Sequence, residues 1–156
     1  MPPPDQPVPR YLALDVGTRR IGIAVSDELG LTAQPVMTLD VHRSRRDDLR
    51  SIARLARRFS ASAIVVGNPL HLSGDQSSRA EKVQAFAAEL GELTGLPVHL
   101  WDERLTSAEA NRLLRETDLS IEKRGKAVDR MAAVLILQGW MEKSRLPASG
   151  SGDSAG

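Results

Sequence analysis

Residues 14–27, LDVGTRRIGIAVSD, place an acidic side chain where a buried strand ends. The apolar run before the turn (11–16) and the alternating run after it (20–26) predict two antiparallel strands joined as a hairpin at Gly17. Asp15 lies at the end of the first strand. An aspartate in this position either bonds to the amides of the turn or carries chemistry, and the stretch alone leaves both interpretations open.

A third strand follows the hairpin, and helices and strands alternate after it. We expect the third strand at 31–39, where Pro35 favours an edge position or a bulge, and further strands at 63–66 and 98–101. Helices are expected at 45–59, 78–93, 106–116 and 127–142. This order predicts an α/β fold with a mixed five-stranded sheet, first antiparallel and then parallel, and helices on both faces. Ligands usually bind where parallel strands end, so chemistry is expected at that edge.

Length and composition predict one globular domain. The chain has 156 residues, 41% hydrophobic and 26% charged, which suffices for a single core. We assign the domain to 10–143 and expect the proline-rich segment 1–9 and the Ser/Gly-rich tail 144–156 to be disordered. The absence of cysteine excludes disulfides and thiolate metal sites. Without a long apolar run or a signal peptide, we expect a cytoplasmic protein that makes no membrane contact.

The net charge of +1 by itself predicts no polyanionic partner. Arginines are nonetheless concentrated between 42 and 60. Helical spacing places six of them on one broad face: Arg43, Arg46, Arg50, Arg54, Arg57 and Arg58. Such a face is usually solvated, and it becomes a candidate for phosphate contact if an active site lies nearby.

Two further acidic positions stand at the ends of expected core elements. Glu103 follows the strand at 98–101, and Asp102 competes for the same role, because successive strand residues face opposite ways. Asp129 falls in the first turn of the expected helix at 127–142, where the helix macrodipole favours an acid. Each acid, taken singly, has an ordinary structural role available.

Taken together, the three acids suggest a metal site. Carboxylates that converge on one crevice repel one another unless a cation compensates them. Mg²⁺ or Mn²⁺ does this best, because hard divalent ions prefer oxygen ligands. Two such ions can activate water and stabilise the leaving oxygen in phosphodiester cleavage. We therefore take Asp15, Glu103 and Asp129 as the candidate catalytic and metal-binding residues.

Four segments in this order resemble the YqgF/RuvX family, which has an RNase H-like fold related to RuvC-type Holliday junction resolvases. They are LDVGTRRIGIAVSD at 14–27, IVVGNPL at 64–70, DERLTS at 102–107, and Asp129 followed by AAVLIL at 132–137. The resemblance covers nearly the whole chain between the two expected disordered ends. The chain departs from the usual family pattern at Asn68, His71 and Arg130.

The resemblance implies a function and a role for each acid. Asp15 would bridge two Mg²⁺ or Mn²⁺ ions, with Glu103 and Asp129 each holding one side. The family is associated with processing the 5′ end of pre-16S ribosomal RNA, and was earlier proposed to resolve Holliday junctions. The implied partner is structured nucleic acid, either pre-rRNA in ribosome precursors or branched DNA. RuvC-type resolvases carry a fourth carboxylate where this chain has Ala132, which disfavours the junction reading.

Several arginines are candidates for contact with nucleic-acid phosphates. They are Arg19, Arg20 and Arg104 beside the acids, and Arg46, Arg50, Arg54 and Arg57 on the helix at 45–59. Only five aromatic side chains are present, so backbone and shape readout fits better than extensive base stacking.

The sequence thus predicts a metal-dependent endonuclease, acting as a monomer or a homodimer. An actin-like ATPase or kinase is a rival interpretation, although such enzymes normally need two domains of this kind. A non-catalytic nucleic-acid-binding module is another. No motif distinguishes an RNA from a DNA substrate.

Overall fold

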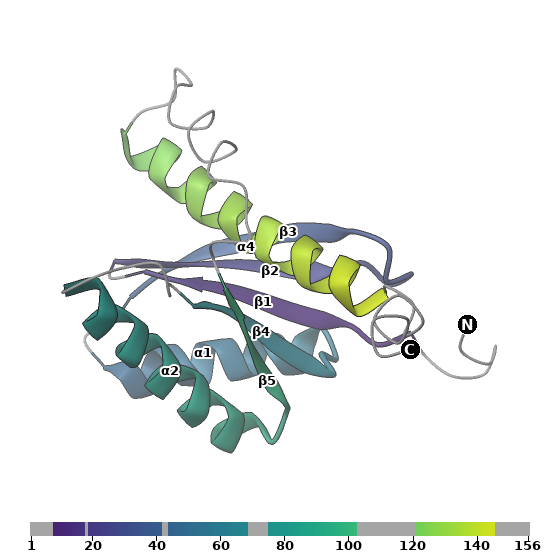
Figure 1. Cartoon of the computed structure of the whole chain (residues 1–156), viewed down its shortest axis with the longest axis horizontal. Helices are drawn as coiled ribbons and strands as arrows, with labels where there is room; N and C mark the ends of the chain where they lie inside the picture. Colours follow the sequence, from purple (N-terminus) through teal and green to yellow (C-terminus); the bar gives the residue numbers. More distant parts are fainter. Residues whose placement is uncertain (1–7, 18, 42–43, 69–74, 103–120, 146–156) are drawn as a thin grey trace, which may run out of the picture.

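The computed structural model describes residues 8–17, 19–41, 44–68, 75–102 and 121–145. Its centre is a five-stranded sheet in the order β3-β2-β1-β4-β5 (Figure 1). The strands are β1 (Tyr11–Val16), β2 (Arg20–Ser26), β3 (Ala33–Asp40), β4 (Ala63–Asn68) and β5 (Val98–Asp102). The first three form an antiparallel meander, and β4 and β5 run parallel to β1. The predicted mixed sheet is confirmed.

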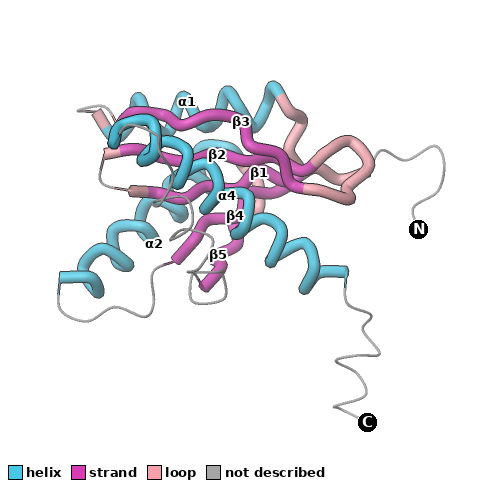
Figure 2. Tube along the Cα trace, turned by 90° about the horizontal axis from the view of Figure 1, so that it is seen from above, coloured by secondary structure: helices cyan, strands magenta, loops and turns pink. Residues whose placement is uncertain are grey.

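Helices cover both faces of this sheet. Figures 1 and 2 show α1 (Arg45–Arg58) and α2 (Asp75–Thr94) on one face and α4 (Ile121–Arg145) on the other. The predicted helix at 106–116 lies outside the described residues, as do residues 1–7 and 146–156. None of the described helices combines the length and apolarity needed to cross a membrane.

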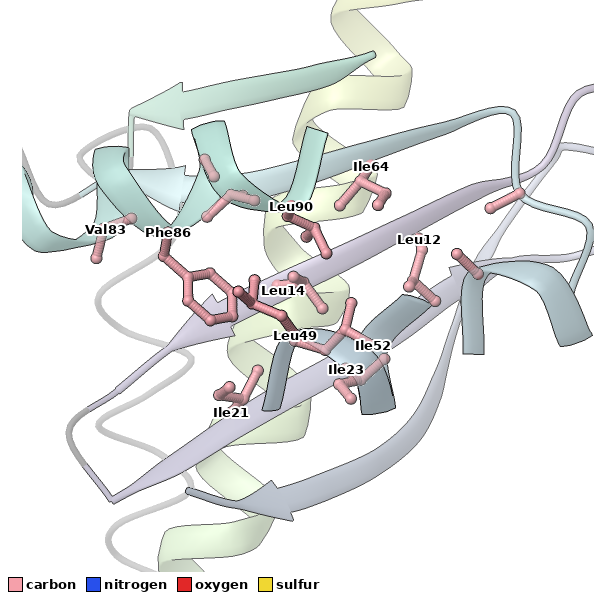
Figure 3. Packing of buried hydrophobic residues seen from close by; sticks show 14 of the residues in the cluster. Leu12, Leu14, Ile21, Ile23, Leu49, Ile52, Ile64, Val83, Phe86 and Leu90 are labelled. Carbon is pink, nitrogen blue, oxygen red and sulfur yellow. The ribbon is translucent and has the colours of Figure 1, made fainter. Parts of the chain in front are cut away.

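Strand alternation divides the core into two layers. Leu12, Leu14 and Ile64 point toward α1 and α2, where they meet Ile52 and Leu90 (Figure 3). On the opposite face, the alanines at 13, 24 and 33 form one cluster with Val65, Trp101 and the buried side of α4. Because alternate strand residues face opposite sides, each strand supplies both layers. Small side chains let α4 lie close to the sheet.

The irregularity expected at Pro35 is present. β3 is an edge strand, and its pairing with β2 shifts register between Ile23, opposite Met37, and Ala24, opposite Pro35. A proline cannot donate a ladder hydrogen bond, so an edge position with a bulge accommodates it.

Three expectations about the helices need correction. α4 begins at Ile121, six residues before the expected start, and continues through Arg145 into the stretch expected to be disordered. It packs on one face of the sheet, and its Met131 is 37% exposed. α2 begins at Asp75, three residues before the expected start at 78.

Candidate functional site at the carboxyl edge of the sheet

Asp15 lies on the face of the sheet that α4 covers. It is half-buried near the carboxyl end of β1 and follows Leu14, which points the other way into the α1/α2 layer. Its neighbour on β2 is Gly22. On β4, Val66 pairs with Leu14, so Gly67 is the next residue beside Asp15. Both adjacent strands therefore present a residue without a side chain next to this carboxylate.

The strand register decides between the two acids at the end of β5. Gly67 pairs with Trp101, whose side chain is buried in the α4 layer. Asp102 pairs with Asn68, and the Asn68 Oδ1 accepts a hydrogen bond from Gln84 Nε2 of α2 at 3.5 Å. Because paired residues of neighbouring strands share a face, Asp102 lies on the α2 side and not on the face of Asp15. Glu103 itself is outside the described residues.

Asp129 lies in the third turn of α4 and not in the first. The macrodipole acts only over the first turn of a helix, so the expected stabilisation of this acid by the helix N-terminus is wrong. Position 129 is one turn before Ala133, which is buried against the sheet. Among the described residues no three His, Cys, Asp or Glu side chains form a metal-binding group. The side chains of Asp129 and Glu103 are not among the described ones.

The turn after Asp15 places Arg19 and Arg20 at the same edge. The Gly17 amide donates to the Arg20 carbonyl oxygen at 2.9 Å, and a Cβ on Gly17 would lie 2.8 Å from that oxygen. Only glycine fits this approach. Arg19 is exposed, and its carbonyl accepts from the Val41 amide at 2.8 Å. The backbone of both arginines thus lies at the edge where β1 ends, and their contact with nucleic acid stays a prediction. Arg104 is outside the described residues.

The arginines of α1 lie in a different layer. Arg46, Arg50, Arg54 and Arg57 are all exposed. They belong to a helix whose buried side packs on the sheet face opposite α4. The structure therefore does not bring them to the face of Asp15. α1 starts just after β3, near the turn, and runs toward the opposite edge, where Arg10 lies over the Phe59 ring.

Two glycine contacts near the site were not found from sequence. Gly67 flanks Asp15 only because β4 pairs with β1 in this register. Gly139 of α4 lies against the indole of Trp101. The local sequence pattern does not show which neighbouring residue occupies the space that a side chain at either glycine would fill.

The sequence matches known proteins over most of its length. The family model described as "RuvX: Holliday junction resolvase" matches residues 9–143. A protein from Koribacter versatilis named "Putative pre-16S rRNA nuclease" is 56% identical over 134 residues, covering 86% of this chain and 87% of that protein. A protein of the same name from Moorella thermoacetica is 45% identical, covering 86% and 95%.

Solved structures show the same fold at low identity. RuvC of T. thermophilus, in complex with a Holliday junction substrate, has a TM-score of 0.56 at 12% identity, covering 87% of this chain and 96% of that one. The fowlpox virus resolvase, in complex with Holliday junction DNA, has a TM-score of 0.53 at 13% identity, covering 88% and 99%. The predicted RNase H-like fold is confirmed.

Proposed function

The chain belongs to the family described as RuvX, Holliday junction resolvase, and from this premise we propose that it is a nuclease that hydrolyses phosphodiester bonds in structured nucleic acid. The substrate we propose is precursor 16S ribosomal RNA, because relatives at 45–56% identity carry that name. We thus propose for this chain the substrate that the names of these relatives give.

The observation that carries the proposal is the position of Asp15. A carboxylate at the carboxyl end of a central strand, between Gly22 and Gly67, has space on both sides in the plane of the sheet. A phosphate group and a metal ion can approach such a carboxylate without displacing a side chain of these two strands. A turn-forming aspartate would need no such space on the neighbouring strands.

We propose that Asp15, Glu103 and Asp129 hold divalent metal, Mg²⁺ or Mn²⁺, as two ions. All three are carboxylates, the ligands that these ions prefer. Bound metal would lower the pKa of a water molecule and stabilise the charge on the leaving oxygen. The family resemblance supports this set, and the register of β5 supports Glu103 over Asp102.

The arginines at the hairpin turn complete the proposed site. Arg19 and Arg20 follow Asp15 through a turn that Gly17 holds tight. We propose that both contact the phosphodiester backbone where it crosses this edge, at which Arg19 is exposed. Arginine suits this role because its planar fork binds phosphate oxygens in pairs. Arg104 is proposed to act with them.

The proposal is tested by cleavage assays with the purified full chain. The substrates are an RNA that spans the mature 5′ end of 16S rRNA and a four-way DNA junction, each with Mg²⁺, with Mn²⁺ or with EDTA. We expect cleavage of the RNA that requires metal and is lost in Asp15→Asn. Glu28→Gln, a carboxylate change at an exposed residue in the turn after β2, serves as the matched control and should retain activity. Cleavage by Asp15→Asn, or in EDTA, would exclude the proposed mechanism.

Branched DNA is the second candidate substrate, because the family description names Holliday junction resolvases. The same assay decides between the two. Preferential cleavage of the junction, with symmetric cuts in two strands, would favour this alternative and would require a dimer.

A further inference from the structure

A groove between α1 and α2 lies on the side of the sheet opposite Asp15. It consists of two adjacent hollows of about 380 and 170 Å³ that share Leu93, a side chain 51% exposed. Arg46 and Arg50 line the first hollow, and Arg57 lines the second. We refer to Arg46, Arg50 and Arg57 as the arginine line.

Arg46, Arg50 and Arg57 are exposed, and Asp47 in the first turn of α1 is the acid nearest to them in the sequence. Within the described part of the chain, none of the three arginines has a hydrogen bond or a salt bridge to another side chain. Their neighbours differ in this respect. Arg45 Nε pairs with Glu89 Oε2 at 2.7 Å, and Arg54 Nη2 donates to Ser51 Oγ at 3.4 Å. Because Arg45 compensates Glu89, the nearest acid in the groove adds little repulsion to an approaching anion.

The arginine line begins at the edge of the proposed nuclease site. The amide of Val41, which follows β3, donates a hydrogen bond to the carbonyl oxygen of Arg19 in the hairpin turn, and α1 starts at Arg45. Arg46 is therefore the member of the line nearest to this edge. Eleven residues of helix separate it from Arg57, a distance of about 16 Å at the rise of an α-helix. The line thus leads from the turn beside Asp15 toward the far edge of the α1/α2 layer.

We propose that the arginine line binds the phosphodiester backbone of the nucleic acid on one side of the cleaved bond. This inference rests on the proposed nuclease function and adds the path of the substrate. A strand that crosses the edge at Arg19 continues over Arg46, Arg50 and Arg57, which contact phosphate oxygens and read no bases. The protein then selects substrates by the length of one flank as well as by the bond that is cut.

Binding of two RNA lengths tests the proposal without cleavage. Fluorescent RNAs with the cleavage site at the centre carry a long or a short flank on either side, and anisotropy gives their Kd for the full chain in EDTA. The test variant is Arg50→Gln/Arg57→Gln. The control, Lys82→Gln/Lys143→Gln, removes two exposed charges that lie on α2 and α4 and not on α1.

We expect the test variant to bind the RNA with one particular long flank roughly tenfold more weakly. It should bind the short RNA with unchanged Kd. The slope of log K against log salt should fall by about two for the long RNA, one for each lost phosphate contact. The control variant should behave like the wild type.

Three results would overturn the proposal: equal weakening for both lengths, no weakening for either, or the same weakening in the control. The outcome is separate from that of the nuclease proposal. Wild-type protein that binds in a flank-dependent manner but never cleaves would refute the nuclease proposal alone, whereas cleavage without flank dependence would refute only the arginine line.

Discussion

The indole of Trp101 packs directly on the backbone of Gly139. A Cβ on Gly139 would lie 2.9 Å from Cζ2 and 3.2 Å from Cε2 of that ring. The contact joins β5 to α4, and Trp101 is 8% exposed. Glu103 follows β5 and Asp129 belongs to α4, and both are proposed metal ligands. This contact therefore sets the distance between β5 and α4.

Gly139→Ala should destabilise the protein by roughly 1–3 kcal/mol, because a rigid buried ring cannot yield to the added methyl group. An alanine in a helix interior would otherwise stabilise by up to about 1 kcal/mol. A lower free energy of unfolding for Gly139→Ala would therefore show that the contact with Trp101 outweighs the helix preference for alanine. Urea unfolding measures this free energy, and the cleavage assay should show reduced activity.

Gly91→Ala provides the matched comparison in α2. Its Cβ would lie 3.4 Å from Val98 Cγ2, an ordinary contact with a side chain. We expect this variant to be as stable as the wild type or more stable. Equal effects of the two substitutions would contradict the assignment of the Gly139 effect to Trp101.

Asp102→Asn should leave most of the nuclease activity intact, whereas Glu103→Gln should reduce kcat by at least about a thousandfold. Asp102 lies on the α2 side with Asn68, away from the face of Asp15. Loss of a metal-holding carboxylate removes charge stabilisation in the transition state, and single losses of this kind cost several kcal/mol. Initial rates at saturating metal measure both. The reverse order of activities would refute the face assignment.

Gly17→Ala should destabilise the hairpin and move Asp15. The added Cβ would meet the Arg20 carbonyl oxygen at 2.8 Å, and this is a backbone atom that cannot turn aside. We expect a lower Tm and a loss of cleavage that extra Mg²⁺ or Mn²⁺ partly restores, because a displaced carboxylate binds metal more weakly. Unchanged stability would show that the turn tolerates a side chain.

Asp27→Asn should lower stability at neutral pH and have little effect in acid. Backbone amide hydrogen bonds, first that of Thr32 and also that of Leu31, hold the pKa of the Asp27 carboxyl below its ordinary value of 3.8. A lowered pKa in the folded state favours the ionised form, so the stabilisation is complete above the unfolded value and disappears as the pH falls through the folded one.

Urea unfolding at pH 7 and near pH 3 measures this difference. The difference in stability between the wild type and Asp27→Asn should be smaller at the lower pH. Glu28→Gln, which removes the same charge from the next, exposed residue, controls for net charge. A stability gap that is equal at both pH values would argue against the role of the ionised Asp27 carboxyl.

The sequence by itself determined the presence of the five strands and their mixed arrangement. β1 and β2 were predicted with the bounds that the structure has, because period-two alternation with a glycine turn is a local signal. The four family segments likewise identified the RuvX family. The choice of Asp15, Glu103 and Asp129 as metal ligands came from the same segments and remains a prediction.

Only the tertiary structure decided which residues share a face or a layer. The pairing of β4 with β5 separated Asp102 from Asp15, and the early start of α4 removed Asp129 from the first turn. Packing also placed the arginines of α1 behind the sheet and brought Gly139 against Trp101. These relationships depend on register and on contacts between residues far apart in the chain. A local pattern carries no information about either, because it fixes the direction of a side chain only relative to its own strand or helix.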